Sequence, residues 1–174
     1  MICLMALITG TTDAAVQEGD WEVDALGTYM QFNKAKDTGN DENVLLLLGS
    51  LGYFLTDNIQ ICGAAIGFFY DPGEHSVDNT DLYGLGIQGK WHFVPQEDWI
   101  PYIGYQLFWG SSDSDNADME GDGLIQGPVA GVRYALTERV DLVVEGQYHM
   151  YEEDLANVYD DGYLIAFGLK YTFE

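Results

Sequence analysis

Apolar and polar residues alternate along most of the chain, in segments of about a dozen residues that polar breaks separate. The stretch from Asn43 to Asp71 shows the unit most clearly, because two charge-free runs of aliphatic residues, glycine and aromatics flank the break Leu55–Asn58. Asp and Asn in that break have the chemistry of a tight turn. Each run is too short for a membrane helix of about 20 apolar residues but long enough for a membrane strand of about 9–11. The unit therefore predicts a strand, a turn and a returning strand.

The same unit repeats and predicts eight strands. They span Trp21–Phe32, Val44–Phe54, Ile59–Tyr70, Leu82–Val94, Trp99–Gly110, Leu124–Leu136, Val140–Tyr151 and Tyr163–Phe173. The connections alternate between long, as in Ser111–Gly123, and short, as in Thr137–Arg139. In an up-and-down meander all long loops then lie at one end and all short turns at the other, which is the layout of outer-membrane barrels. The pattern predicts an all-β fold, an eight-stranded antiparallel transmembrane β-barrel.

Charged residues within the predicted strands share one face of each strand, and the opposite face is uncharged. Side chains alternate faces along a strand, so each strand has an apolar face and a mixed polar face. Glycines such as Gly86, Gly104 and Gly131 accompany the charges, which suits a narrow lumen. We therefore predict a charge network inside the barrel, formed by Glu22, Asp24, Lys90, Arg133, Asp141, Glu145 and Lys170. Within it we expect Arg133 to pair first with Asp141, which is the closer match in height on the next strand, and Glu145 to belong to the same network. Val44–Phe54 and Ile59–Tyr70 are apolar on both faces, so their orientation stays open.

Bulky aromatic residues concentrate near the strand ends on the apolar faces. Two belts of amphipathic rings suit the two interfaces of a membrane. The predicted girdles contain Trp21, Tyr29, Trp91, Trp99, Trp109, Tyr148, Tyr163, Tyr171 and Phe173. The alternative is a soluble barrel of the lipocalin type, which would put the apolar faces inside and bind a ligand there.

The charge balance is strongly acidic, with 29 Asp and Glu against 6 Lys and Arg and a net charge of −23. Nucleic acid is therefore excluded as a partner, because binding phosphates needs a basic face. More than half of the acidic residues fall in the long connections. We interpret them as a solvated surface, and the alternative is that they bind divalent cations that bridge to lipid phosphates.

The first fifteen residues, MICLMALITGTTDAA, contain an apolar run followed by small residues. This is typical of the end of a secretory signal peptide, although the usual basic segment is missing. The alternative is a first strand or a buried helix. We predict a signal segment over residues 1–15 and a single barrel domain over 16–174. Cys3 lies in that segment, and Cys62 is then a lone thiol that we interpret as a packing residue.

Four segments carry a resemblance to a known family. They are Gly52–Asn58, Trp99–Gly104, Gly131–Glu138 and the ending Gly168–Phe173. With them the chain resembles small eight-stranded outer-membrane β-barrels of the OmpA-like transmembrane and opacity-protein type, over the whole of residues 16–174. The resemblance implies location in the bacterial outer membrane and recognition of the last strand, through Phe173, by the barrel-assembly machinery. Members usually end on the aromatic residue, whereas this chain adds Glu174.

No motif in the chain supports catalysis or a cofactor. Asp113, Asp115 and Asp118 resemble part of a calcium loop but lack its glycine and its glutamate. Glu74, His75 and Ser76 are adjacent in a loop, whereas a catalytic triad needs side chains that converge. We predict no catalytic residue, no metal site and no cofactor, and an outer-membrane lipid-modifying enzyme is the less favoured alternative.

These observations predict a monomeric outer-membrane protein with a structural or surface-interaction role. Its partners would be outer-membrane lipid and lipopolysaccharide. The lumen would be at most a narrow pore for small solutes, because eight strands enclose a space that side chains fill.

Overall fold

The structure is a computed structural model that describes residues 16–33, 41–71, 80–114, 120–157 and 159–173. The expected signal segment at 1–15 lies outside the described residues. So do Glu74, His75 and Ser76, two of the three aspartates of the calcium-like stretch, and Glu174.

Eight strands form a closed antiparallel barrel in which each strand pairs with its sequence neighbours and β1 pairs with β8. The strands are β1 (Trp21–Asn33), β2 (Asp41–Phe54), β3 (Ile59–Asp71), β4 (Thr80–His92), β5 (Trp99–Ser114), β6 (Gly121–Ala135), β7 (Val140–Tyr151) and β8 (Gly162–Phe173). All eight predicted strands are confirmed. Several of them continue farther toward the long loops than predicted, because backbone pairing goes on after the apolar pattern has ended.

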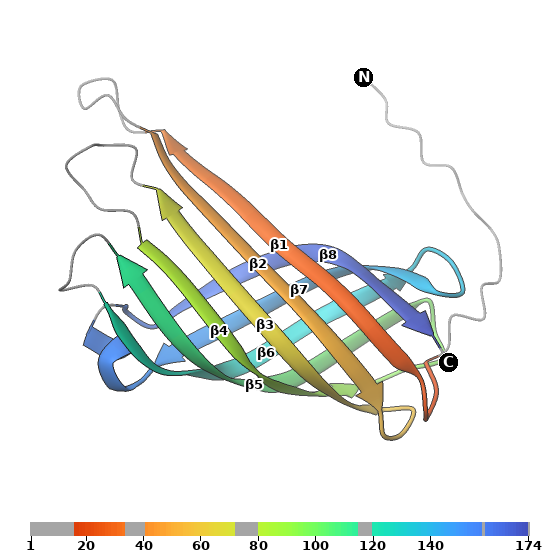
Figure 1. The fold of residues 1–174 in the computed structure, drawn as a ribbon. Coiled ribbons are helices and arrows are strands. Elements are labelled where there is room, and N and C mark those ends of the chain that lie inside the picture. Colours follow the sequence, from red (N-terminus) through yellow and green to blue (C-terminus); the bar gives the residue numbers. More distant parts are fainter. Residues whose placement is uncertain (1–15, 34–40, 72–79, 115–119, 158, 174) are drawn as a thin grey trace, which may run out of the picture.

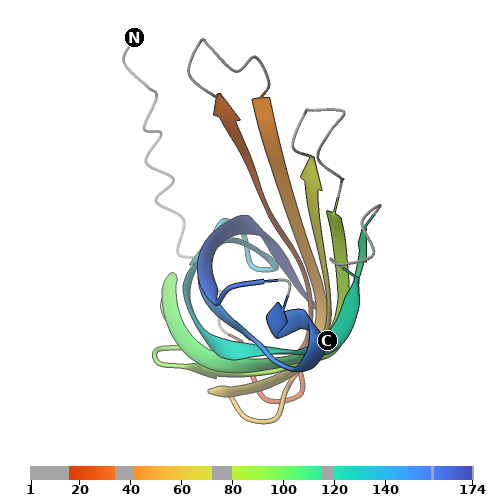
Figure 2. The same ribbon diagram turned by 90° about the vertical axis from the view of Figure 1, so that its left-hand side faces the viewer.

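The strand ends that the long connections join lie at one end of the barrel, and the short turns lie at the other (Figure 1). We call these the loop end and the turn end. The strands differ in how far they reach, and β1 to β4 rise past β8 at the loop end (Figure 2). β1 pairs with β2 from Trp21 to Asn33 but with β8 only from Trp21 to Gly27. The seam that closes the barrel is therefore restricted to its turn-side half.

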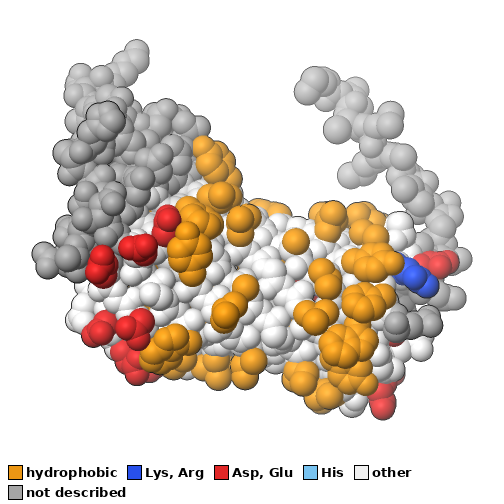
Figure 3. Space-filling view, in the orientation of Figure 1, with side chains coloured by type: hydrophobic (Ala, Val, Ile, Leu, Met, Phe, Trp, Pro, Cys, Tyr) orange, Lys and Arg blue, Asp and Glu red, His pale blue; other side chains and the backbone are white. Residues whose placement is uncertain are grey.

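The apolar faces point outward and the polar faces inward, as in a membrane barrel and opposite to a soluble one. Leu85 is 73 % exposed, whereas Lys90 on the same strand is 2 % exposed. Figure 3 shows apolar side chains gathered mostly toward the two ends of one face, with acidic side chains beyond them. No helix in the described ranges is long and apolar enough to cross a membrane.

The structure orients the two strands whose faces the sequence left open. In β2 the inward residues are Val44, Leu46, Leu48, Ser50, Gly52 and Phe54, and in β3 they are Gln60, Cys62, Ala64 and Ile66. Cys62 is buried and free, in keeping with a packing role.

Several inward glycines allow neighbouring backbones to approach closely. A Cβ on Gly168 would overlap the carbonyl of Ala25 across the β1–β8 seam, and one on Gly86 would overlap the carbonyl of Leu107. Only glycine fits at such positions, so these residues fix how tightly the wall can curve.

Candidate functional site

The lumen is the candidate functional site, because all seven charged residues predicted to line it are buried there. β1 contributes Glu22 and Asp24, β7 contributes Asp141 and Glu145, and β4, β6 and β8 contribute one cation each. All seven lie in the turn-side half of the barrel. Buried charges are tolerable only when they are paired, so their contacts determine whether the lumen is stable.

Arg133 is bonded to two carboxylates. Its Nε donates a hydrogen bond of 2.6 Å to Asp141 Oδ2, and its Nη2 donates to the same oxygen. Its Nη1 lies 2.6 Å from Glu22 Oε2. The heights of the strands predicted the contact with Asp141, and the contact with Glu22 was not predicted. A guanidinium suits this position because its planar fork can serve two acceptors at once.

The two lysines extend this pairing into a continuous series of ion pairs. Lys170 Nζ lies 2.8 Å from Glu22 Oε1 and 3.1 Å from Asp24 Oδ2. Lys90 Nζ lies 3.1 Å from Glu145 Oε2 and 3.7 Å from Asp24 Oδ2. Charges therefore alternate in the order Asp141, Arg133, Glu22, Lys170, Asp24, Lys90 and Glu145. Glu145 belongs to this network through Lys90 and lies at the end of the series opposite Asp141.

Neutral side chains that the sequence analysis missed complete the network. Gln60 Nε2 donates to Glu22 Oε1 at 2.8 Å, and the Tyr102 hydroxyl donates to Glu145 Oε2 at 2.6 Å. The Tyr102 ring centre lies 5.4 Å from the Nζ atoms of both Lys90 and Lys170. Tyr102 could have been found, because it alternates with the outward residues of its strand, whereas the orientation of the strand that carries Gln60 was open.

From the charged residues toward the loop end, the lumen is lined first by glutamine side chains and then by apolar ones. Gln88 donates to Gln106 at 3.2 Å, and Gln106 donates to Gln147 at 3.5 Å. A buried apolar cluster follows toward the loop end. Its members include Leu26, Leu46, Leu48, Ile66, Leu82, Phe108 and Ile125.

The β7–β8 connection closes the loop end of the lumen. It contains a short 3₁₀ helix, η2 (Glu153–Asn157), which lies in the mouth of the barrel (Figure 2). Leu155 is 0 % exposed and belongs to the apolar cluster. Tyr159 stacks on Tyr151 with ring centres 5.2 Å apart, and the hydroxyl groups of Tyr159 and Ser112 lie 2.9 Å apart.

This connection was predicted only as one of the solvated acidic loops. Tyr151, Leu155 and Tyr159 recur every four residues, and this spacing is the signal that could have identified it. Burial, with a smaller contribution from Asp81, raises the pKa of Tyr159, so its hydroxyl group stays protonated and can donate a hydrogen bond.

The predicted aromatic girdles lie on the outer face. Eight of the nine residues are exposed, and Phe173 is half-buried and stacks on Tyr171 with ring centres 6.2 Å apart. Near the turn end, Trp99 packs on Tyr134 with ring centres 4.5 Å apart. Within the described parts of the chain, no group of three or more His, Cys, Asp or Glu side chains could hold a metal ion.

Comparison with known proteins agrees with this architecture. Residues 1–173 match the family model described as outer membrane protein beta-barrel domain. Outer membrane porin F of Pseudomonas aeruginosa is 26 % identical over 142 residues, which cover 77 % of this chain but only 40 % of that protein.

Solved structures show the same fold at low sequence identity. The N-terminal β-barrel domain of Pseudomonas aeruginosa OprF has a TM-score of 0.61 at 22 % identity, covering 91 % of this chain and 100 % of that one. Neisserial surface protein A has a TM-score of 0.61 at 17 % identity, covering 88 % and 96 %. A de novo designed transmembrane β-barrel also matches, with a TM-score of 0.52 at 15 % identity, covering 91 % and 99 %. A designed barrel has the fold without an evolved role, so these matches establish architecture alone.

Polar residues inside, apolar residues outside, aromatic girdles at both ends and a family match over residues 1–173 lead to one conclusion. The chain belongs to the outer membrane protein β-barrel family and is a protein of the bacterial outer membrane.

Proposed function

We propose that this protein is a structural and surface-interaction barrel of the outer membrane, with a lumen that is closed at rest, and that it is not an enzyme. The observation that supports the proposal is the filling of the lumen at every level. Charged residues occupy the turn-side half, glutamines the middle and an apolar cluster capped by Leu155 the loop end. Such a barrel presents its outer wall to lipid and its long loops to the outside.

Conductance in planar bilayers tests the closed lumen. We expect no steady current from the parent protein, because an ion would have to pass both the paired charges of the turn-side half and the apolar cluster at the loop end. The paired change Arg133→Met with Asp141→Leu removes one link of the charges but leaves the mouth intact, so we expect this variant to stay closed as well. Large, stable channels formed by the parent would show that the lumen is open and would instead support the porin role named for the Pseudomonas relative.

The orientation of the barrel can be tested by labelling single cysteines on intact cells. Asn157 in η2 and Gln96 in the β4–β5 turn are both exposed, whereas the native Cys62 is buried and gives little background. The other native cysteine, Cys3, is replaced by serine in both variants. We expect a membrane-impermeant maleimide to label Asn157→Cys on intact cells and Gln96→Cys only after permeabilisation. The reverse pattern would place the short turns outside and contradict the proposed surface role of the loops.

Three partner assignments belong to the same proposal. Lipid and lipopolysaccharide cover the outward apolar band, and the barrel-assembly machinery engages the last strand through Phe173. The protein is a monomer, because its strands close on themselves and the described barrel needs no second chain to complete its sheet.

A further inference from the structure

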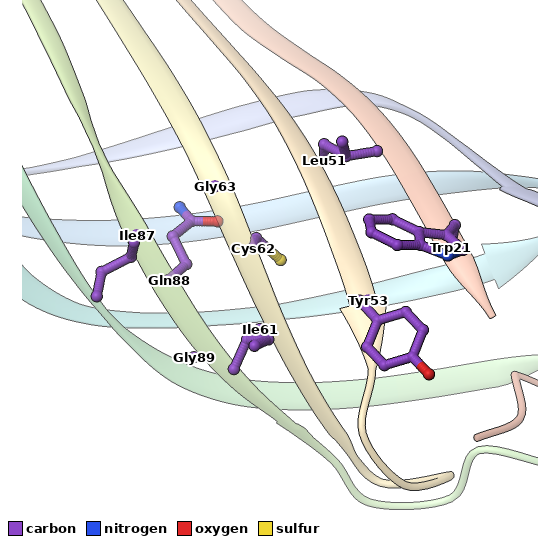
Figure 4. Close-up of a pocket in the computed structure, with 9 residues that line it drawn as sticks. All are labelled: Trp21, Leu51, Tyr53, Ile61, Cys62, Gly63, Ile87, Gln88 and Gly89. Carbon is purple, nitrogen blue, oxygen red and sulfur yellow. The ribbon is translucent and has the colours of Figure 1, made fainter. Parts of the chain in front are cut away.

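A groove crosses the outer face of β1 to β4 in the turn-side half of the barrel (Figure 4). It encloses about 540 Å³, within the range of about 300–1,000 Å³ of sites that hold small ligands. Its walls are the side chains of Trp21, Leu51, Tyr53, Ile61 and Ile87. Its floor is the backbone at Gly63 of β3 and Gly89 of β4.

The groove exists because two glycines, which have no side chain, lie among large apolar residues. In the register of the sheet, Gly63 lies between Leu51 and Ile87, and Gly89 lies beside Ile61. A Cβ on either glycine would meet nothing within 4 Å. Glycine weakens a strand interior, and here no approach of neighbouring protein atoms requires it. The two glycines therefore keep open a space that faces the membrane.

The occupant of this space must be apolar along its length, because the groove faces the hydrocarbon of the membrane. Trp21 and Tyr53 pack together at its turn end, with ring centres 5.0 Å apart. Amphipathic rings of this kind lie at the level of lipid headgroups. The groove thus begins at a headgroup layer and runs into the acyl layer, as a lipid tail does.

Charges at the turn end select among headgroups. Asp20 directly precedes Trp21, and Asp57 lies in the β2–β3 turn, where its Oδ1 accepts a hydrogen bond of 2.9 Å from the Glu18 backbone N–H. Arg139, the one basic residue of the short turns, lies in the β6–β7 turn, four strands from Asp57 and two strands from Trp21 round the barrel. These carboxylates attract an ammonium group and repel a headgroup of net negative charge.

We propose that the groove binds an acyl chain of a zwitterionic, amine-bearing glycerophospholipid from the leaflet at the turn end. The proposal rests on location in the outer membrane and not on the closed lumen. It can therefore fail while the proposed structural role stands, and the reverse also holds.

Native mass spectrometry of the delipidated full chain in detergent tests the groove. We expect the parent to retain one added phosphatidylethanolamine and to bind phosphatidylglycerol more weakly. Gly63→Leu with Gly89→Leu fills the floor and should weaken the affinity for the lipid by roughly tenfold, which corresponds to a loss of about 1.4 kcal/mol of binding free energy. The matched control is Gly146→Leu on the outward face of β7, where a Cβ meets only backbone oxygens at 3.7 Å and 3.9 Å. This variant should retain the lipid like the parent.

A heat-dependent mobility shift on gels confirms that each variant is folded before lipid is added. Equal retention by the parent and the filled variant would overturn the groove as a lipid site. Equal retention of the two lipids by the parent would overturn the headgroup selection, and Asp57→Asn should reduce the preference if it is correct. A parent dimer that becomes monomeric when the floor is filled would show that a second copy of the chain, rather than lipid, occupies the groove.

Discussion

Replacing Arg133 by alanine is expected to lower the free energy of unfolding by about 3–5 kcal/mol, the usual cost of removing one partner of a buried ion pair. The structure gives a specific reason, because Arg133 is the link between Asp141 and Glu22. Without it Asp141 forms no ion pair with a described residue, and Glu22 keeps only its pair with Lys170. Unfolding by denaturant in detergent micelles, followed by the mobility shift on gels, measures the loss.

Two further variants separate charge pairing from packing at this position. Arg133→Met with Asp141→Leu removes both charges of one pair and should recover part of the loss, since Glu22 still contacts Lys170 and Gln60. Arg139→Ala removes a cation from an exposed turn and should cost about 1 kcal/mol or less. Unchanged stability of Arg133→Ala would mean that the guanidinium is solvated and that the lumen contains water at this level.

Replacing Gly168 by alanine is the second change with a large expected effect. The new Cβ would overlap the carbonyl of Ala25, so β1 and β8 must move apart in the seam that closes the barrel. Overpacking commonly costs about 1–3 kcal/mol, and we expect the upper part of that range because the neighbour is backbone and cannot change rotamer. The yield of folded barrel after refolding into detergent, measured by the mobility shift, should fall accordingly.

Gly63→Ala is the matched control for this change, because it adds the same methyl group where nothing lies within 4 Å. It should fold as well as the parent. If Gly168→Ala refolds equally well, the seam is not packed as closely as the structure describes.

The strands could be predicted from the sequence because the wall of a membrane barrel imposes a strict alternation. Lys90 and Lys170 are each surrounded by alternating apolar residues, so their inward direction follows directly. Leu45 and Leu46 give no such contrast, since one faces lipid and the other faces an apolar part of the lumen. The sequence left β2 and β3 unoriented for the same reason, and only their pairing with β1 and β4 resolves them.

The contacts of the network were less predictable than its members. Height along adjacent strands identified Asp141 as a partner of Arg133, because the two residues belong to one hairpin. Glu22 reaches Arg133 across the lumen from β1, and such cross-barrel contacts depend on strand tilt and register. The short helix η2 in the mouth of the barrel was missed because acidic residues dominate the composition of the β7–β8 connection.

The short seam between β1 and β8 has a consequence for how the barrel chooses its register. Outward residues along the seam, within Trp21–Gly27 and Phe167–Phe173, are all apolar, so a slip of two residues would leave this part of the lipid-facing surface equally acceptable. Such a slip would separate Lys170 from Asp24, which is its direct partner in the register, and would move Gly168 away from Ala25. One buried charge pair and one glycine therefore define the stagger of the closed sheet, and with it the tilt and the diameter of the barrel.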